Sequence, residues 1–217
     1  MNKQYGFTLT EIAIVILIIG LLIGSVLKGQ QMITTAKIKN IEGNYSSLAK
    51  AIYTYQERYS ALPGDDNAAS RFRFIQKGAA NNGNGDGIIG NDDQSYKRQE
   101  KTLDKEVVSV WLHLRAASLI PGPKDPTQAD DADPFKPIEN AFGGLIGVES
   151  NRLNIEGVFV GFTDIPFEIA EILDARHDDK QPAQGLVQAE SNDILANNPP
   201  LDNYDNSNPL VNILFAL

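Results

Sequence analysis

The sequence predicts an α+β fold, in which a long N-terminal helix packs against a small antiparallel β-sheet. Apolar residues recur at helical spacing as far as Tyr59. From Gly144 onward, short runs rich in β-branched and aromatic residues alternate with Pro, Gly, Asn and Asp, as strands separated by turns do. A helical segment followed by a set of strands is typical of the α+β class.

The first part of this helix is apolar enough to enter a bilayer. The run from Phe7 to Leu27 has about the 20 residues needed to cross the hydrocarbon layer. A secretory signal peptide fits less well, because its apolar core is shorter and a small-residue cleavage site follows it. A plain membrane anchor accounts for the apolar run but not for Glu11, the one acidic side chain within it.

Glu11 needs a partner inside a membrane. An acidic residue at mid-membrane depth costs about 2.5 to 3.5 kcal/mol, so such groups persist where they pair or have a function. Cleavage of the chain after Gly6 would create the amino group of Phe7, a cation four residues away on this subunit or on a neighbour.

The residues around Glu11 resemble the N-terminal signature of type IV pilins and pseudopilins. The motif is Gly6-Phe7-Thr8-Leu9-Thr10-Glu11, preceded by a short polar leader with Lys3 and followed by the apolar run Ile12 to Leu27. The resemblance implies that a prepilin peptidase cleaves after Gly6 and methylates Phe7. It also implies that Glu11 pairs with a neighbour's terminal amine as subunits stack into a filament.

Two positions depart from the family pattern. Thr10 stands where a larger aliphatic residue is commoner, and Lys28 stands where many pilins have a helix-interrupting proline. The cleavage site keeps its pattern. Whether this helix unwinds on assembly stays open.

Beyond the membrane segment, one apolar stripe continues the helix. Its members, spaced alternately by three and four residues, are Ile38, Ile41, Tyr45, Leu48, Ile52, Tyr55 and Tyr59. We expect a helix from Phe7 to about Tyr59, with the chain's own sheet as the cover of the stripe. The turn Leu62-Pro63-Gly64-Asp65 ends the helix, and Asp65 or Asp66 is expected to cap a short helix that extends to Lys77.

The expected organisation is a leader at 1–6, a transmembrane segment at 7–27 and one α+β head at 28–217. The formal net charge of −9 and the pI near 4.7 argue against nucleic-acid binding, which calls for a basic surface. The chain has no cysteine, so its core, or a bound metal, must hold the head together without a disulfide.

An Asn-Gly-rich segment in the middle of the chain has the spacing of a calcium loop. The side chains of Asn82, Asn84 and Asp86 take the first, third and fifth positions, Ile88 the backbone-carbonyl position and Asp93 the twelfth. Two of the three early ligands are amides, so the affinity for Ca²⁺ should be modest. The alternative is a polar surface loop without an ion, and the sequence leaves both open.

The remaining elements belong to the head. We expect a helix at Val107–Ile120 with Trp111 in the core, and a short helix at Pro166–Asp174. The expected strands are Leu145–Val148, Val158–Phe162, Leu186–Ala189 and Val211–Leu217. Asp178 and Asp179 form either a solvated turn or a second ion site.

These observations favour a structural protein over an enzyme, because neither histidine has zinc or catalytic-triad spacing and the chain lacks a thiol nucleophile. The hypothesis is a subunit of a type IV pilus-like filament or a type II secretion pseudopilus, with a prepilin peptidase and other pilin subunits as partners. It predicts a single-pass protein of a bacterial inner membrane, with its head in the periplasm or on the cell surface after assembly. The second hypothesis is a membrane-anchored periplasmic calcium-binding module that does not polymerise.

Overall fold

The computed structural model describes residues 8–73, 75, 82–90, 96–97, 106–124, 133–192 and 199–217. The chain divides into two compact units, 1–39 and 40–217. Each unit is described by itself. The boundary falls inside the first helix, so the second unit consists of the C-terminal part of that helix together with the head.

Helix α1 spans Leu9–Tyr59, which confirms the long helix expected from the sequence. Its end is local in origin. Ser60 takes a positive φ of 53° and donates its N–H to the carbonyl of Gln56 at 2.8 Å. A left-handed residue directly after the last turn is a common way to end a helix, and Pro63 three residues later prevents its continuation.

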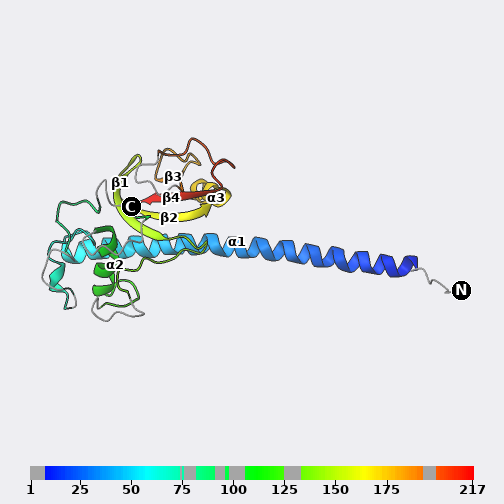
Figure 1. The fold of residues 1–217 in the computed structure, drawn as a ribbon, viewed down its shortest axis with the longest axis horizontal. Helices are drawn as coiled ribbons and strands as arrows, with labels where there is room; N and C mark the ends of the chain where they lie inside the picture. The colour runs from blue at the N-terminus through cyan, green and yellow to red at the C-terminus, as the bar shows by residue number, and fades with distance from the viewer. Residues whose placement is uncertain are drawn as a thin grey trace. The chain divides into compact units, whose positions relative to one another are not determined.

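The head contains a four-stranded antiparallel sheet in the order β1-β2-β4-β3 (Figure 1). The strands are β1 (Ile146–Arg152), β2 (Ile155–Pro166), β3 (Val187–Ser191) and β4 (Leu210–Ala216). Each of the four runs expected from the sequence lies in one of these strands or overlaps it. β1 and β2 extend several residues further than expected, because their hairpin continues with the less apolar residues around Asn151.

Within the second unit, α1 buries its apolar stripe against the head. Ile41, Leu48 and Ile52 are buried, and the Tyr45 ring packs on Phe215 of β4 with 4.9 Å between ring centroids. The Tyr45 hydroxyl donates to the carbonyl of Ala216 at 2.9 Å. These contacts confirm the predicted α+β architecture of a long helix with a small antiparallel sheet.

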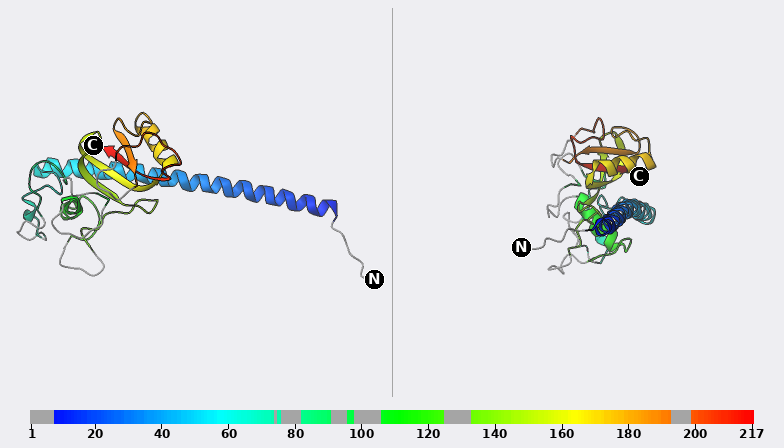
Figure 2. Two further views of the ribbon diagram at one scale, coloured as in Figure 1. Left: turned by 45° about the horizontal axis from the view of Figure 1, so that its top comes forward. Right: turned by 90° about the vertical axis from the view of Figure 1, so that its right-hand side faces the viewer.

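The smaller helices lie around the sheet (Figure 2). Helix α3 (Phe167–His177) contacts strands β2, β3 and β4, and helix α2 (Glu106–Ala116) contacts β1. α2 ends four residues earlier than the predicted Ile120, because Ser118 takes a φ of 60° and the N–H of Leu119 turns back to the carbonyl of Leu114 at 2.9 Å. Trp111 is buried, as expected.

The helix expected after Asp66 is much shorter in the described residues. Only a 3-10 turn, Ala69–Arg71, is present there, and Ala68 precedes it without a side-chain cap. Asp66 accepts the N–H of Ala68 at 2.9 Å, a local contact of the capping kind, and both aspartates also have more distant partners. Asp66 accepts hydrogen bonds from the Tyr55 hydroxyl at 2.6 Å and from Arg71 at 3.0 Å, while Asp65 binds a distant loop described below.

The sheet face opposite α1 is covered by Tyr96. Leu214 and Phe215 are neighbours in β4, so their side chains point to opposite faces of the sheet. Leu214 packs with Tyr96 and Phe159. Tyr96 lies over the paired glycines Gly147 and Gly161: an added Cβ at Gly161 would lie 2.5 Å from its ring, and one at Gly147 would lie 2.4 Å from its Cβ. Glycine is therefore required at both positions.

A buried charge network anchors Tyr96 and Lys97 to this face. Glu190, which is fully buried, accepts from the Tyr96 hydroxyl at 2.8 Å and pairs with Lys97 at 2.8 Å and Arg152 at 2.9 Å. Glu149 accepts the backbone N–H of Tyr96 at 3.2 Å. Burial raises the pKa of the Glu149 carboxyl to about 7, against the opposing effect of the Arg152 guanidinium.

We expect Glu149→Gln to reduce the pH dependence of head stability. Because the pKa of Glu149 is raised in the folded head, the folded state holds this proton more tightly than the unfolded chain. Its stabilising contribution is complete below about pH 4.5 and is lost as pH rises through about 7, a difference of up to about 3 kcal/mol. Urea unfolding of fragment 28–217 at pH 5 and at pH 8 gives the free energy of unfolding of wild type and variant at each pH. Between pH 5 and pH 8 the free energy of unfolding should fall more for wild type than for Glu149→Gln. A difference between the two proteins that is the same at both pH values would contradict this expectation.

Candidate functional site

The first turn of α1 is closed by a reciprocal pair of hydrogen bonds between Thr8 and Glu11. The N–H of Glu11 donates to Thr8 Oγ1 at 3.3 Å, and the N–H of Thr8 donates to Glu11 Oε2 at 2.7 Å. This arrangement is a capping box, which satisfies two N–H groups that a helix start leaves without partners. The spacing Thr-x-x-Glu was a signal for it in the sequence.

The capping box also orients the Glu11 carboxylate. The Thr8 hydroxyl donates to the same oxygen, Oε2, at 2.7 Å, so one carboxylate oxygen holds both Thr8 contacts. Among the described residues, none donates a hydrogen bond to the other oxygen, Oε1. Gly6 and Phe7, the predicted processing residues, lie outside the described residues.

Helix α1, which has Glu11 in its first turn, is the one described helix long and apolar enough to cross a membrane, judged by length and composition. The side chains of its apolar run are exposed within this chain. The membrane-length segment and the cap therefore occupy the same stretch of sequence.

Residues 1–27 match the family model described as the prokaryotic N-terminal methylation motif. The chain carries a prepilin-type N-terminus. No curated protein and no solved structure matches the chain.

The motif supports a type IV pilin-like precursor, the kind of chain that a prepilin peptidase processes. Together with the single apolar helix, it is consistent with single-pass membrane anchoring. The predicted prepilin signature is confirmed.

In the head, the described part of the predicted calcium loop, residues 82–90, wraps around the side chain of Asp65. The Asp65 carboxylate is only 3% exposed. It accepts three consecutive backbone N–H groups, those of Gly85 at 2.6 Å, Asp86 at 3.1 Å and Gly87 at 2.8 Å. Several N–H groups that converge in this way form a nest for an anion, and here a carboxylate of the same chain fills it.

A second buried carboxylate, Glu106, holds the same loop from the other side. It belongs to the first turn of α2 and accepts the N–H groups of Asn84 at 3.0 Å and Gly90 at 3.1 Å. Burial raises the pKa of the Glu106 carboxyl, against these two backbone hydrogen bonds. Its place at a helix N-terminus also favours a negative charge.

The predicted calcium ligands do not share one arrangement. Asn82 Oδ1 accepts the N–H of Ser70 at 3.1 Å, outside the loop. Asn84 Oδ1 accepts the N–H of Asp86 at 2.7 Å, and Asp86 Oδ1 accepts the N–H of Ile88 at 2.9 Å. Asp93 lies outside the described residues. Calcium binding by this loop stays a prediction.

Sequence reasoning missed Asp65 because its partner loop lies about 20 residues further along the chain. The Pro-Gly turn before it is itself held by His113, which is fully buried and accepts the N–H of Gly64 at 2.9 Å. Gly64 has a φ of 95°, and a Cβ there would lie 2.7 Å from the carbonyl oxygen of Glu106.

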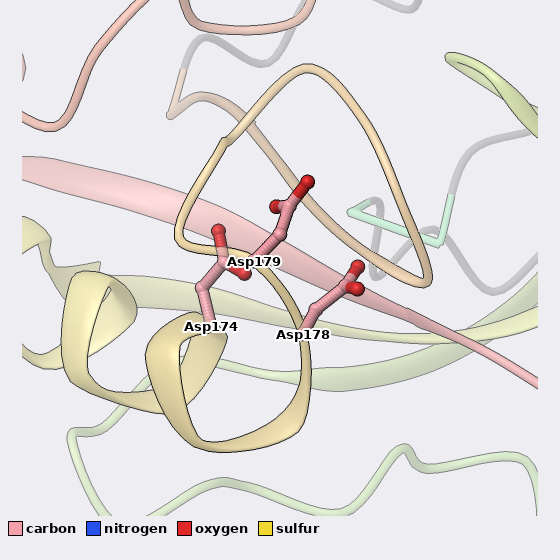
Figure 3. Close-up of side chains that lie close together, drawn as sticks. All are labelled: Asp174, Asp178 and Asp179. Atoms are coloured by element: carbon pink, nitrogen blue, oxygen red, sulfur yellow. The ribbon is translucent and has the colours of Figure 1, made fainter.

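The carboxylates of Asp174, Asp178 and Asp179 lie within 4.8 Å of one another (Figure 3). Each accepts hydrogen bonds from the protein: Asp174 from Tyr204 and the N–H of Lys180, Asp178 from the N–H groups of Leu186 and Val187, and Asp179 from the N–H of Gln181. Asp178 and Asp179 are exposed or half-buried residues after the end of α3, whereas Asp174 is a fully buried residue of that helix, and a second ion site stays a prediction.

Melting of fragment 28–217 in millimolar calcium and in chelator separates the contribution of the hydrogen bonds between the loop and Asp65 from that of calcium binding. We expect Asp65→Asn to lower the melting temperature by several degrees in both buffers. Its amide would place N–H donors against backbone donors, and an unmatched buried donor costs about 1 to 3 kcal/mol.

Asp86→Asn is the matched control, since it makes the same chemical change at an exposed position of the loop. It should leave the melting temperature in chelator almost unchanged. If the loop binds calcium, the ion at ten times Kd adds about 1.4 kcal/mol to wild type, and Asp86→Asn reduces that gain. Equal melting temperatures of the wild-type fragment in both buffers would show a polar loop without an ion.

Proposed function

We propose that the chain is a structural subunit of a type IV pilus-like filament or of a type II secretion pseudopilus. In this proposal a prepilin peptidase cleaves after Gly6 and methylates Phe7. The single observation that carries it is the methylation motif over residues 1–27, which coincides with a membrane-length helix. The subunit sits in the bacterial inner membrane, with its head in the periplasm or, after assembly, on the cell surface.

The capping geometry supports a role for Glu11 in assembly. Because Thr8 holds Oε2, the carboxylate is oriented before any neighbour arrives, and Oε1 can accept a charged amine. The amine at Phe7 of an adjacent subunit is a suitable cation. Its charge offsets the cost of the carboxylate in the membrane.

The role is structural and not enzymatic, since the motif is that of subunits on which the peptidase acts. The head then serves as the outward part of the subunit. A calcium-binding module that never polymerises would share the membrane helix and the loop, but it would have no use for cleavage after Gly6.

Mass spectrometry of the intact protein from its own host tests the processing. We expect a mature chain that begins at Phe7, with an added methyl group on its amine. Gly6→Leu should leave the leader attached, because a bulky residue blocks the cleavage site. A wild-type chain that still begins at Met1 would refute the subunit proposal and favour the non-polymerising anchor.

Two substitutions of Glu11 separate its capping role from its charge. Glu11→Ala removes both, whereas Glu11→Gln keeps a capping-box side chain and removes only the charge. We expect both variants to stay in the membrane with a folded head, and both to enter filaments much less than wild type. The fraction of chain in sheared filaments measures this. Normal incorporation of Glu11→Gln would assign Glu11 to capping alone.

A further inference from the structure

One face of α1 just beyond the membrane segment is exposed and positively charged. It consists of Lys28, Met32, Thr35 and Lys39, which we call the lysine stripe. Their spacings of four, three and four residues place the four side chains on one side of a helix. All four are exposed, and Met32 has 65% of its surface accessible.

The acidic residue that follows the stripe, Glu42, pairs with Arg176 at 3.0 Å and not with Lys39. Neither Lys28 nor Lys39 forms an ion pair with any residue that the structure describes. The segment 28–39 contains three lysines and no acidic residue. In the sequence, Lys50 repeats the eleven-residue interval between Lys28 and Lys39.

The compensating charge lies further along the chain. Residues 51–217 hold 14 basic and 26 acidic residues, hence a formal net charge of −12. The head is therefore strongly acidic, whereas the helix segment next to the membrane is basic. Such a separation of charge within one chain provides complementary surfaces for contact between copies.

We propose that the lysine stripe docks against the acidic head surface of a neighbouring copy of this chain. The inference rests on the proposed function, because a filament or pseudopilus is what brings a second copy alongside. Met32 would supply an apolar contact between the two charged ends of the stripe, and Met adapts readily to a partner surface. The pairing would orient neighbouring subunits and would weaken at high salt.

A membrane surface is a less suitable partner for the whole stripe. Lys28 directly follows Leu27 and lies within reach of lipid headgroups. Lys39 lies twelve residues beyond Leu27, about 18 Å along the helix axis. That distance exceeds the Debye length of about 8 Å at physiological salt, so lipid charge acts weakly there. Lys39 therefore distinguishes a protein partner from a lipid partner.

The test compares three variants of the full-length chain in its own host membranes. Lys39→Gln removes one positive charge from the stripe. Asn40→Glu makes the same change in net charge at the adjacent exposed residue, which points about 100° away around the helix. Lys39→Arg keeps the charge but removes the primary amine that a carbodiimide couples to a carboxylate.

We measure the fraction of chain in filaments or sedimenting oligomers, and the yield of carbodiimide-linked dimer, with the linked residues mapped by mass spectrometry. Lys39→Gln should lower incorporation about two- to fivefold, the effect of one exposed ion pair. Asn40→Glu should incorporate normally. Wild type should give a dimer that joins Lys39 to an acidic residue of the head, and Lys39→Arg should lose this link while it still incorporates.

The N-terminus of each variant is sequenced in parallel. Suppose that the wild-type chain is processed at Phe7 and assembles, and that Lys39→Gln assembles equally well. This result would overturn the docking proposal and leave the proposed function intact. An equal loss in Lys39→Gln and Asn40→Glu would assign the effect to net charge and overturn it too. A wild-type chain that forms no oligomer would overturn both proposals.

Discussion

The structure depends on the need to cover the apolar surface of one long helix along its whole length. In the second unit the head covers the helix: Ile41, Leu48 and Ile52 are buried, and Tyr45 packs on Phe215 of the sheet. In the first unit the apolar side chains from Ile14 to Leu27 remain exposed within the chain, so they require lipid or other subunits. A single helix thus belongs to two environments, and the proposed function follows from this constraint.

The head stabilises its loops with buried carboxylates in a chain that has no disulfide. Asp65, Glu106 and Glu190 each accept several donors from segments distant in the sequence. Each buried carboxylate fixes loop positions at the cost of desolvation, so its partners must all be in place. This arrangement makes the described segments 64–66, 84–90 and 96–97 sensitive to the replacement of a carboxylate by an amide.

At the N-terminus, the proposed function gives one side chain an intermolecular role in addition to its local one. Glu11 closes the first turn of its own helix through Thr8, and the same geometry leaves one oxygen for a cation from elsewhere. The two roles are compatible because they use different oxygens. A carboxylate that already has two partners is also less costly to place near the membrane than an isolated one.

Features that depend on neighbours in the sequence could be predicted from it. The membrane-length run, the α1 stripe, its end near Pro63, the four strands and the prepilin motif are all expressed in residue type and spacing over a few turns or a few residues. The capping box was available in the same way. The ligand spacing of Asn82, Asn84 and Asp86 was also visible, but spacing does not show which donors reach which acceptors.

Only the tertiary structure decided where the buried polar groups find their partners. Asp65 meets Gly85–Gly87 across about 20 residues, His113 meets Gly64 across 49, and Tyr96 lies on Gly147 and Gly161 because β1 and β2 pair in that register. A buried polar atom must be paired, but a sequence shows only that a polar residue is present. The identity of the partner depends on how the chain folds back, because a hydrogen bond forms only between groups that the fold brings to about 3 Å from each other.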